Sequence, residues 1–111
     1  MAPLQQPMTR SAIFSVDFSP QGDGFTLHGE LDVSTAPTLD AMIDLVSVVG
    51  ADIVLDLRDL KFIDSIGLTR FVRLRLKAEQ YGHRLVLRRP PPNVLRVLRV
   101  TGLDTVMPVE S

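Results

Sequence analysis

A chain of 111 residues has the size of one domain, and it can bury enough apolar surface to fold without a metal or a disulfide. It has no cysteine, which excludes disulfides, thiolate zinc sites and thiol catalysis and fits a reducing cytoplasm. Because no apolar run approaches the ~18 residues of a membrane span and the first ten residues lack a signal-peptide pattern, we expect a cytoplasmic protein with no membrane contact. We expect residues 1–10 to form a flexible tail and residues 11–111 to form a single domain.

Charge is unevenly distributed along the chain, whose net charge is −1. Residues 1–60 carry nine acidic and two basic side chains, whereas residues 61–111 carry four acidic and ten basic ones. A basic half can indicate nucleic-acid binding, but the two halves can also lie side by side and neutralise each other. The chain has no tryptophan, one tyrosine and five phenylalanines, too few for a base-stacking platform, so we expect no nucleic-acid partner.

Apolar periodicity and turn residues predict strands and helices in the order β-β-α-β-α-β-α. This order predicts an α/β fold with a mixed sheet, in which an opening antiparallel hairpin is followed by parallel strands joined by helices. The nearly all-apolar third strand should be central and covered on both faces. The expected strands are residues 13–18, 25–31, 52–57 and 84–87, with a possible edge strand at 107–109, and the expected helices run from Ser34 or Thr35 to Gly50, from Asp64 or Ser65 to Tyr81, and from Val94 to Thr101.

Ser65 is the most informative residue, because it lies where an apolar strand-like segment changes directly into a helix. A serine at a helix start should have an exposed hydroxyl surrounded by free backbone N–H groups. Such a serine can be a nucleophile, a phosphate acceptor or simply a helix cap. A nucleophile elbow requires Gly-x-Ser-x-Gly, but Ile63 occupies the position of the first glycine. The two histidines, His28 and His83, are expected to be structural or solvent-facing, so we do not expect an enzyme.

As a phosphate acceptor, Ser65 would place a dianion over the positive end of the helix dipole. Asp64 is its neighbour in sequence, and Asp32 is close in space if the second and third strands end at the same edge of the sheet. A phosphate beside these carboxylates would repel a docked partner. Thr69, one helical turn further on, is expected to be a helix-surface residue rather than a second acceptor.

Asp56 and Asp59 form another acidic pair, after the third predicted strand. Paired carboxylates can hold a metal or an acyl phosphate, as in receiver domains. Receivers also need an acidic pair after their first strand and a late lysine, and neither is present here. We therefore interpret Asp56 and Asp59 as turn and capping residues and expect no metal and no cofactor.

Two separated motifs resemble those of a known family. Gly29-Glu30-Leu31-Asp32, followed by a helix, a strand and Asp64-Ser65-Ile66-Gly67-Leu68, is similar to the STAS domain in its small anti-sigma factor antagonist form. The resemblance covers about residues 13–109, and it implies a STAS-like mixed sheet covered by about three to four helices. Ile66 departs from the small or hydroxyl residue that is frequent at its position, which makes this surface more apolar.

The resemblance also implies a function. In such proteins, the serine after the aspartate is phosphorylated by an anti-sigma factor with a histidine-kinase-like ATPase fold, and a PP2C-type phosphatase removes the phosphate. The unphosphorylated antagonist binds the anti-sigma factor and frees a sigma factor for transcription. Carried over to this chain, Ser65 is the acceptor, and the docking surface comprises Asp32, Asp64, Ile66, Gly67 and Leu68. The alternative is a STAS scaffold or transporter-associated subunit that never cycles phosphate.

Overall fold

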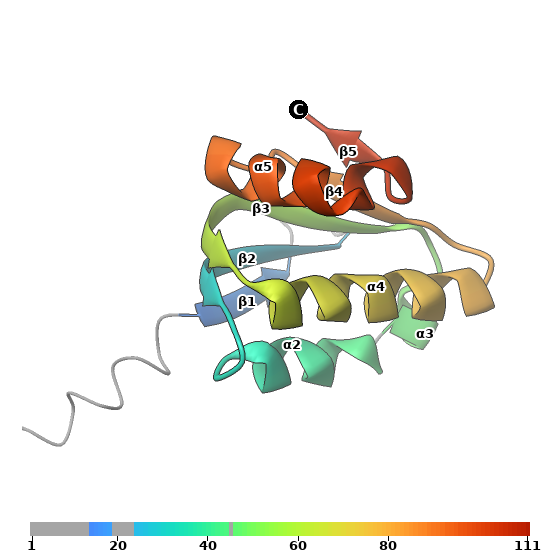
Figure 1. Ribbon diagram of the computed structural model, residues 1–111. Coiled ribbons are helices and arrows are strands. Elements are labelled where there is room, and N and C mark those ends of the chain that lie inside the picture. Colours follow the sequence, from blue (N-terminus) through green and yellow to red (C-terminus); the bar gives the residue numbers. More distant parts are fainter. Residues whose placement is uncertain (1–13, 19–23, 45) are drawn as a thin grey trace, which may run out of the picture.

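The computed structural model describes residues 14–18, 24–44 and 46–111 (Figure 1). The predicted tail at residues 1–10 lies outside the described residues, and so do residues 19–23 between the first two strands. In chain order the elements are β1 (Phe14–Phe18), β2 (Gly24–Leu31), α2 (Ala36–Ile43), α3 (Val46–Val49), β3 (Ile53–Ile63), α4 (Ser65–Gln80), β4 (Leu85–Arg88), α5 (Pro92–Thr101), the 3₁₀ helix η2 (Leu103–Thr105) and β5 (Val109–Glu110).

The strands form one mixed sheet in the order β1-β2-β3-β4-β5. β1 and β2 are antiparallel, and the three later pairings are all parallel. This confirms the predicted hairpin followed by parallel strands, since each parallel connection passes through a helix. None of the helices in the described ranges is long and apolar enough to cross a membrane.

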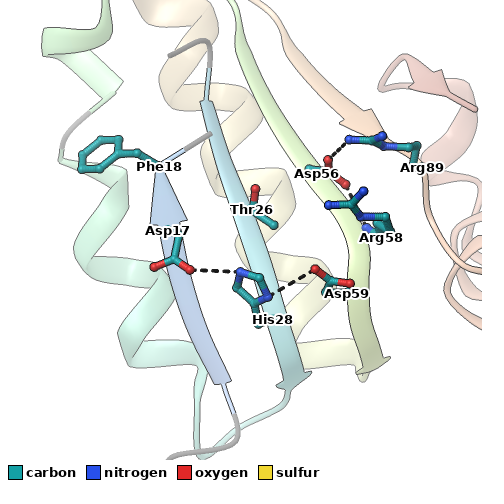
Figure 2. A pocket seen from close by; sticks show the side chains of 8 residues that line it. All are labelled: Asp17, Phe18, Thr26, His28, Asp56, Arg58, Asp59 and Arg89. Atoms are coloured by element: carbon teal, nitrogen blue, oxygen red, sulfur yellow. Dashed lines mark hydrogen bonds and ion pairs between the residues drawn. The ribbon is translucent and has the colours of Figure 1, made fainter. Parts of the chain in front are cut away.

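The helices pack on one face of the sheet and share a single apolar core with it. The core joins inward residues of β3, such as Leu55 and Leu57, to Leu39 of α2, Phe71 of α4 and Leu98 of α5. In Figure 2 the helices lie behind the sheet, and Asp56, Arg58 and Asp59 line a pocket on its other face, where Arg58 is exposed. β3 is central as predicted, and its residues 53–57 are all buried, which agrees with the prediction that both faces of this part of the strand are covered.

Two predicted boundaries are wrong. The helix predicted up to Gly50 ends at Ile43 and is followed by the separate short helix α3, whose β-branched valines are weak helix formers. β3 continues to Ile63 instead of ending at Leu57, so Asp56 and Asp59 lie within the strand rather than in a turn or cap. The strand accommodates the charged side chains of Asp56, Arg58 and Asp59 because they lie on the sheet face opposite the helices.

The later elements are present as predicted, although α5 begins at Pro92 rather than Val94 and β5 is Val109–Glu110 rather than 107–109. Asp64 caps α4, Gly82 follows its end with φ +79°, and Gly102 ends α5 with φ +78°. The two charge halves also neutralise each other, because Arg70 pairs with Asp40 at 2.6 Å and Arg84 pairs with Asp52 at 3.4 Å. Helices α2, α4 and α5 all begin at the same edge of the sheet, where β2 and β3 end (Figure 1). We call this edge the carboxyl edge.

Candidate functional site

The parallel pairing of β2 and β3 brings the two predicted motifs together at the carboxyl edge. Leu31 and Ile63, the last residues of the two strands, are register partners. The backbone N–H of Asp64 donates to the carbonyl oxygen of Leu31 at 3.2 Å. Asp32 and Asp64 therefore follow adjacent strands at the same level. The sequence analysis expected Asp32 to be close to Ser65 only if these two strands end at the same edge of the sheet, and they do.

Ser65 is the first residue of α4, and its side chain is exposed. Asp64 has extended backbone angles, and its carboxylate accepts a hydrogen bond from the N–H of Gly67 at 2.9 Å. Because Asp64 performs the capping, the hydroxyl of Ser65 is not needed as the helix cap. Its position over the helix start also places it at the positive end of the helix dipole.

Gly67 and Leu68 are part of the packing beneath this surface. A Cβ at Gly67 would lie 2.8 Å from Cγ of Leu31 and 2.8 Å from Cγ1 of Ile63. Leu68 is 7% exposed, whereas Ile66 is partly exposed. Of the predicted docking residues after the serine, Ile66 offers side-chain surface, while Gly67 and Leu68 fix how closely the first turn of α4 lies on the strand ends.

Asp32 is held in a tight turn of its own. Its Oδ1 accepts hydrogen bonds from the Ser34 hydroxyl at 2.7 Å and from the Ser34 and Thr35 N–H groups at 2.9 and 3.2 Å. The Ser34 hydroxyl is the largest of the causes that lower the pKa of Asp32 below the ordinary value of 3.8, with the backbone N–H groups adding to it. Asp32 is therefore ionised throughout the physiological pH range, and a negative charge added nearby meets a fixed carboxylate.

Thr69 lies on the exposed surface of α4, as predicted. Its hydroxyl donates to the Ile66 carbonyl oxygen at 2.6 Å and accepts from Arg70 at 3.2 Å. Arg70 in turn bonds Asp40 of α2. These bonds occupy the Thr69 hydroxyl within the helix surface, whereas no described residue engages the Ser65 side chain.

The histidines do not form a catalytic arrangement with Ser65. His28 lies on the sheet face opposite the helices, between Asp17 at 3.1 Å and Asp59 at 3.4 Å (Figure 2). His83 follows the end of α4, at the far end of that helix from Ser65. The described residues thus give the serine no histidine base, which a nucleophilic mechanism needs.

The acidic pair of β3 is likewise engaged by other side chains. Asp56 is 7% exposed, accepts from the Arg58 N–H at 3.0 Å and forms an ion pair with Arg89 (Figure 2). Burial raises the pKa of Asp56, but the bonds from Arg58 and Arg89 outweigh it, and the net shift is downward. In the part of the chain that the structure describes, no group of three or more His, Cys, Asp or Glu side chains could hold a metal ion.

Two apolar residues at this edge were missed by the sequence reasoning. Val33 is 68% exposed in the turn after Asp32, and Phe62 is 46% exposed near the end of β3. Phe62 is exposed because the pairing register shifts between Gly29 and Glu30, which breaks the alternation that would bury it together with Leu60. An argument that assumes strict alternation cannot reveal such a shift. The signal that could have indicated it is the interrupted alternation in Leu60-Lys61-Phe62-Ile63, where two apolar residues are adjacent.

Comparisons with known proteins agree with this fold. The family model described as "Mlab, STAS domain" matches residues 14–109. The "Anti-sigma-B factor antagonist" of Bacillus subtilis (strain 168) is 30% identical over 85 residues, which cover 77% of this chain and 78% of that protein. The chain therefore belongs to the STAS domain family.

Solved structures give the same result. An anti-sigma factor antagonist from Mycobacterium paratuberculosis is 29% identical, with a TM-score of 0.68 over 87% of this chain and 83% of that one. A candidate anti-sigma factor antagonist from Thermotoga maritima is 25% identical, with a TM-score of 0.72 over 91% and 88%. The Bacillus protein SpoIIAA in its phosphorylated form is 22% identical, with a TM-score of 0.62 over 88% and 91%, and shows the shared fold.

Proposed function

We propose that this protein is an anti-sigma factor antagonist that binds an anti-sigma factor when Ser65 is unmodified and releases it when Ser65 is phosphorylated. The observation that carries the proposal is the exposed Ser65 side chain at the start of α4, directly after Asp64 and beside the strand end that Asp32 follows. The names of the relatives from Bacillus subtilis and Mycobacterium paratuberculosis support the same function.

In this proposal, the anti-sigma factor is itself the kinase and has a histidine-kinase-like ATPase fold. It docks on the surface formed by Asp32, Asp64 and Ile66, whose shape depends on the close packing of Gly67 and Leu68. Docking brings the γ-phosphate of its bound ATP to the Ser65 hydroxyl. The hydroxyl oxygen attacks that phosphorus, the bond to the ADP leaving group breaks, and the hydroxyl proton is lost. A PP2C-type phosphatase then hydrolyses the phosphoserine.

Phosphorylation opposes docking for electrostatic reasons. The phosphate adds about −1.5 to −2 charges at neutral pH, at the strand ends that Asp32 and Asp64 follow, and Asp32 is ionised there because its pKa is lowered. Like charges brought together in an interface cost several kcal/mol. A penalty of about 3 kcal/mol raises the Kd about a hundredfold. The switch therefore needs no conformational change in the antagonist, because the added charge alone disfavours the complex.

The test uses the anti-sigma factors of the host that carry an ATPase domain of this type, each purified and titrated against the chain. We expect one of them to bind the wild type and Ser65→Ala equally. Ser65→Asp should bind about a hundredfold more weakly. Ser15→Asp, which adds the same charge at an exposed position of β1, is the matched control and should bind as the wild type does. Equal weakening by both aspartates would contradict the proposal.

The scaffold or transporter-associated alternative makes a different prediction. Such a subunit would bind a permease complex, and Ser65 would carry no phosphate after incubation with any of these anti-sigma factors and ATP. Mass spectrometry of Ser65 after that incubation separates the two functions.

A further inference from the structure

A groove lies beside the serine, on the side away from Asp32. Its lining comes from the end of β3 and the first two turns of α5, and it encloses a volume of about 470 Å³. This size is within the range of pockets that receive ligand groups or side chains. The lining residues are Phe62, Ile63, Pro92, Asn93, Arg96 and Val97.

The groove is continuous with the proposed docking surface. Ile63 lines it, and the next two residues are the helix cap Asp64 and the acceptor Ser65. The start of α5 and the start of α4 lie at the same edge of the sheet (Figure 1). A protein that covers Ser65 therefore also reaches the groove.

The groove is largely apolar and held in place by the fold. Phe62 is 46% exposed and is not part of the apolar core. The Asn93 side chain donates to the carbonyl oxygen of Lys61 at 2.8 Å, which ties the start of α5 to the end of β3. An apolar side chain that enters such a preformed site loses contact with water without the cost of reorganising the site.

Two basic residues without an acidic partner belong to the groove or adjoin it: Arg96 lines it, and Lys61 precedes Phe62. Lys61 and Arg96 are exposed, and neither forms an ion pair with another residue in the described ranges. Two acidic residues are also near: Glu30 is the register partner of Phe62, and Asp64 directly follows Ile63. Since Lys61 and Arg96 have no acidic partner among the described residues, a partner with acidic groups placed over these two side chains would complement them.

We propose that this groove receives an apolar side chain of the anti-sigma factor, flanked by acidic residues that meet Lys61 and Arg96. The inference rests on the proposed function and adds a second contact region to it, separate from the phosphorylation site. In this arrangement Ser65 determines when the complex forms, and the groove determines how tightly the unphosphorylated protein binds. Phe62 and Arg96 are positioning residues for the phosphoryl transfer, since they hold the kinase without touching the reacting atoms.

The test compares matched variants with the anti-sigma factor that phosphorylates the wild type. Phe62→Ser is compared with Tyr81→Ser, because Tyr81 is an aromatic residue of nearly the same exposure, 47%, at the far end of α4. Arg96→Glu is compared with Arg99→Glu, another exposed arginine of α5 that does not line the groove. Thermal unfolding of each variant establishes that the fold is kept.

We expect Phe62→Ser and Arg96→Glu each to raise the Kd and the KM for phosphorylation about tenfold or more, with kcat unchanged. The two control variants should stay within about twofold of the wild type. If all four variants bind equally well while the wild type is phosphorylated on Ser65, the groove proposal is overturned and the proposed function stands. If the wild type is neither bound nor phosphorylated by any of the candidate kinases, the proposed function itself is contradicted, and the groove proposal, which depends on it, is contradicted with it.

Discussion

A methyl group added at Gly67 should destabilise the protein, although alanine is the better helix former. The Cβ of Gly67→Ala would lie 2.8 Å from Cγ of Leu31, 3.1 Å from its Cδ2 and 2.8 Å from Cγ1 of Ile63. Leu31 and Ile63 are 0% and 4% exposed, so neither can turn out into solvent. The first turn of α4 must therefore move away from the strand ends, or the core beneath it must shift.

The expected magnitude is the difference between two effects. Overpacking a filled core costs about 1–3 kcal/mol, and replacing glycine by alanine within a helix recovers about 1 kcal/mol. We expect a net loss of about 1 kcal/mol in the free energy of unfolding, measured by urea denaturation with an unchanged m-value. The corresponding decrease in Tm is roughly 4 °C or slightly more.

A double-mutant cycle with Leu31→Ala isolates the contact. Truncation of Leu31 alone should cost about 2–5 kcal/mol because it leaves a cavity. In the double variant, the new methyl group partly occupies that cavity, so the two costs should add to more than the measured loss. A stabilisation of Gly67→Ala by about 1 kcal/mol, which is the helix-propensity gain alone, would refute the close packing, and so would strict additivity in the cycle.

Two further predictions concern the carboxylates of the fold. Asp64→Ala removes the side-chain cap of α4 and should lower the free energy of unfolding by about 1 kcal/mol, while Asp64→Asn keeps an acceptor and most of the stability; equal losses in urea denaturation would argue against the cap. Asp56 has a lowered pKa, so its contribution is fully present above its ordinary value of 3.8 and is lost as the pH falls below it. Urea denaturation between about pH 5 and pH 2.5 should show a weaker pH dependence for Asp56→Asn than for the wild type, and parallel curves would mean that the pair with Arg89 does not shift this pKa.

The sequence was sufficient where one local signal determined one local structure. Glycines with positive φ follow the ends of α4 and α5 because residues with a side chain are strained in that conformation. Gly82 and Gly102 therefore allowed both helix ends to be predicted. Asp64 capped its helix for an equally local reason. The order of strands and helices then restricted the sheet to the observed pairing.

The prediction failed where tertiary contacts decided the outcome. β3 extends through Arg58 and Lys61 because pairing with β2 continues as far as Leu31 and Ile63, and no property of the charged residues themselves indicates this. The exposure of Phe62 depends on a register shift in that same pairing. The groove beside Ser65 could not be predicted for the same reason, since its two walls come from β3 and α5 and meet only in the folded sheet.

The candidate site was predicted in part. Ser65, Asp64 and Asp32 were identified from the strand-to-helix change and the neighbouring carboxylates, the resemblance added Ile66, Gly67 and Leu68, and parallel strands explain why the two motifs meet at one edge. The different environments of Ile66, Gly67 and Leu68 could not be assigned from sequence, because each depends on how closely α4 lies on the strand ends. Their roles in docking remain proposals.

The most direct test of the account is to add ATP to the preformed complex with the anti-sigma factor and to follow two quantities together. These are the fraction of complex remaining and the phosphate occupancy of Ser65 by mass spectrometry. We predict that the complex dissociates in step with phosphate on Ser65, and that the Ser65→Ala complex stays intact under the same conditions. A complex that persists with Ser65 fully phosphorylated, or that dissociates while Ser65 is unmodified, would contradict it.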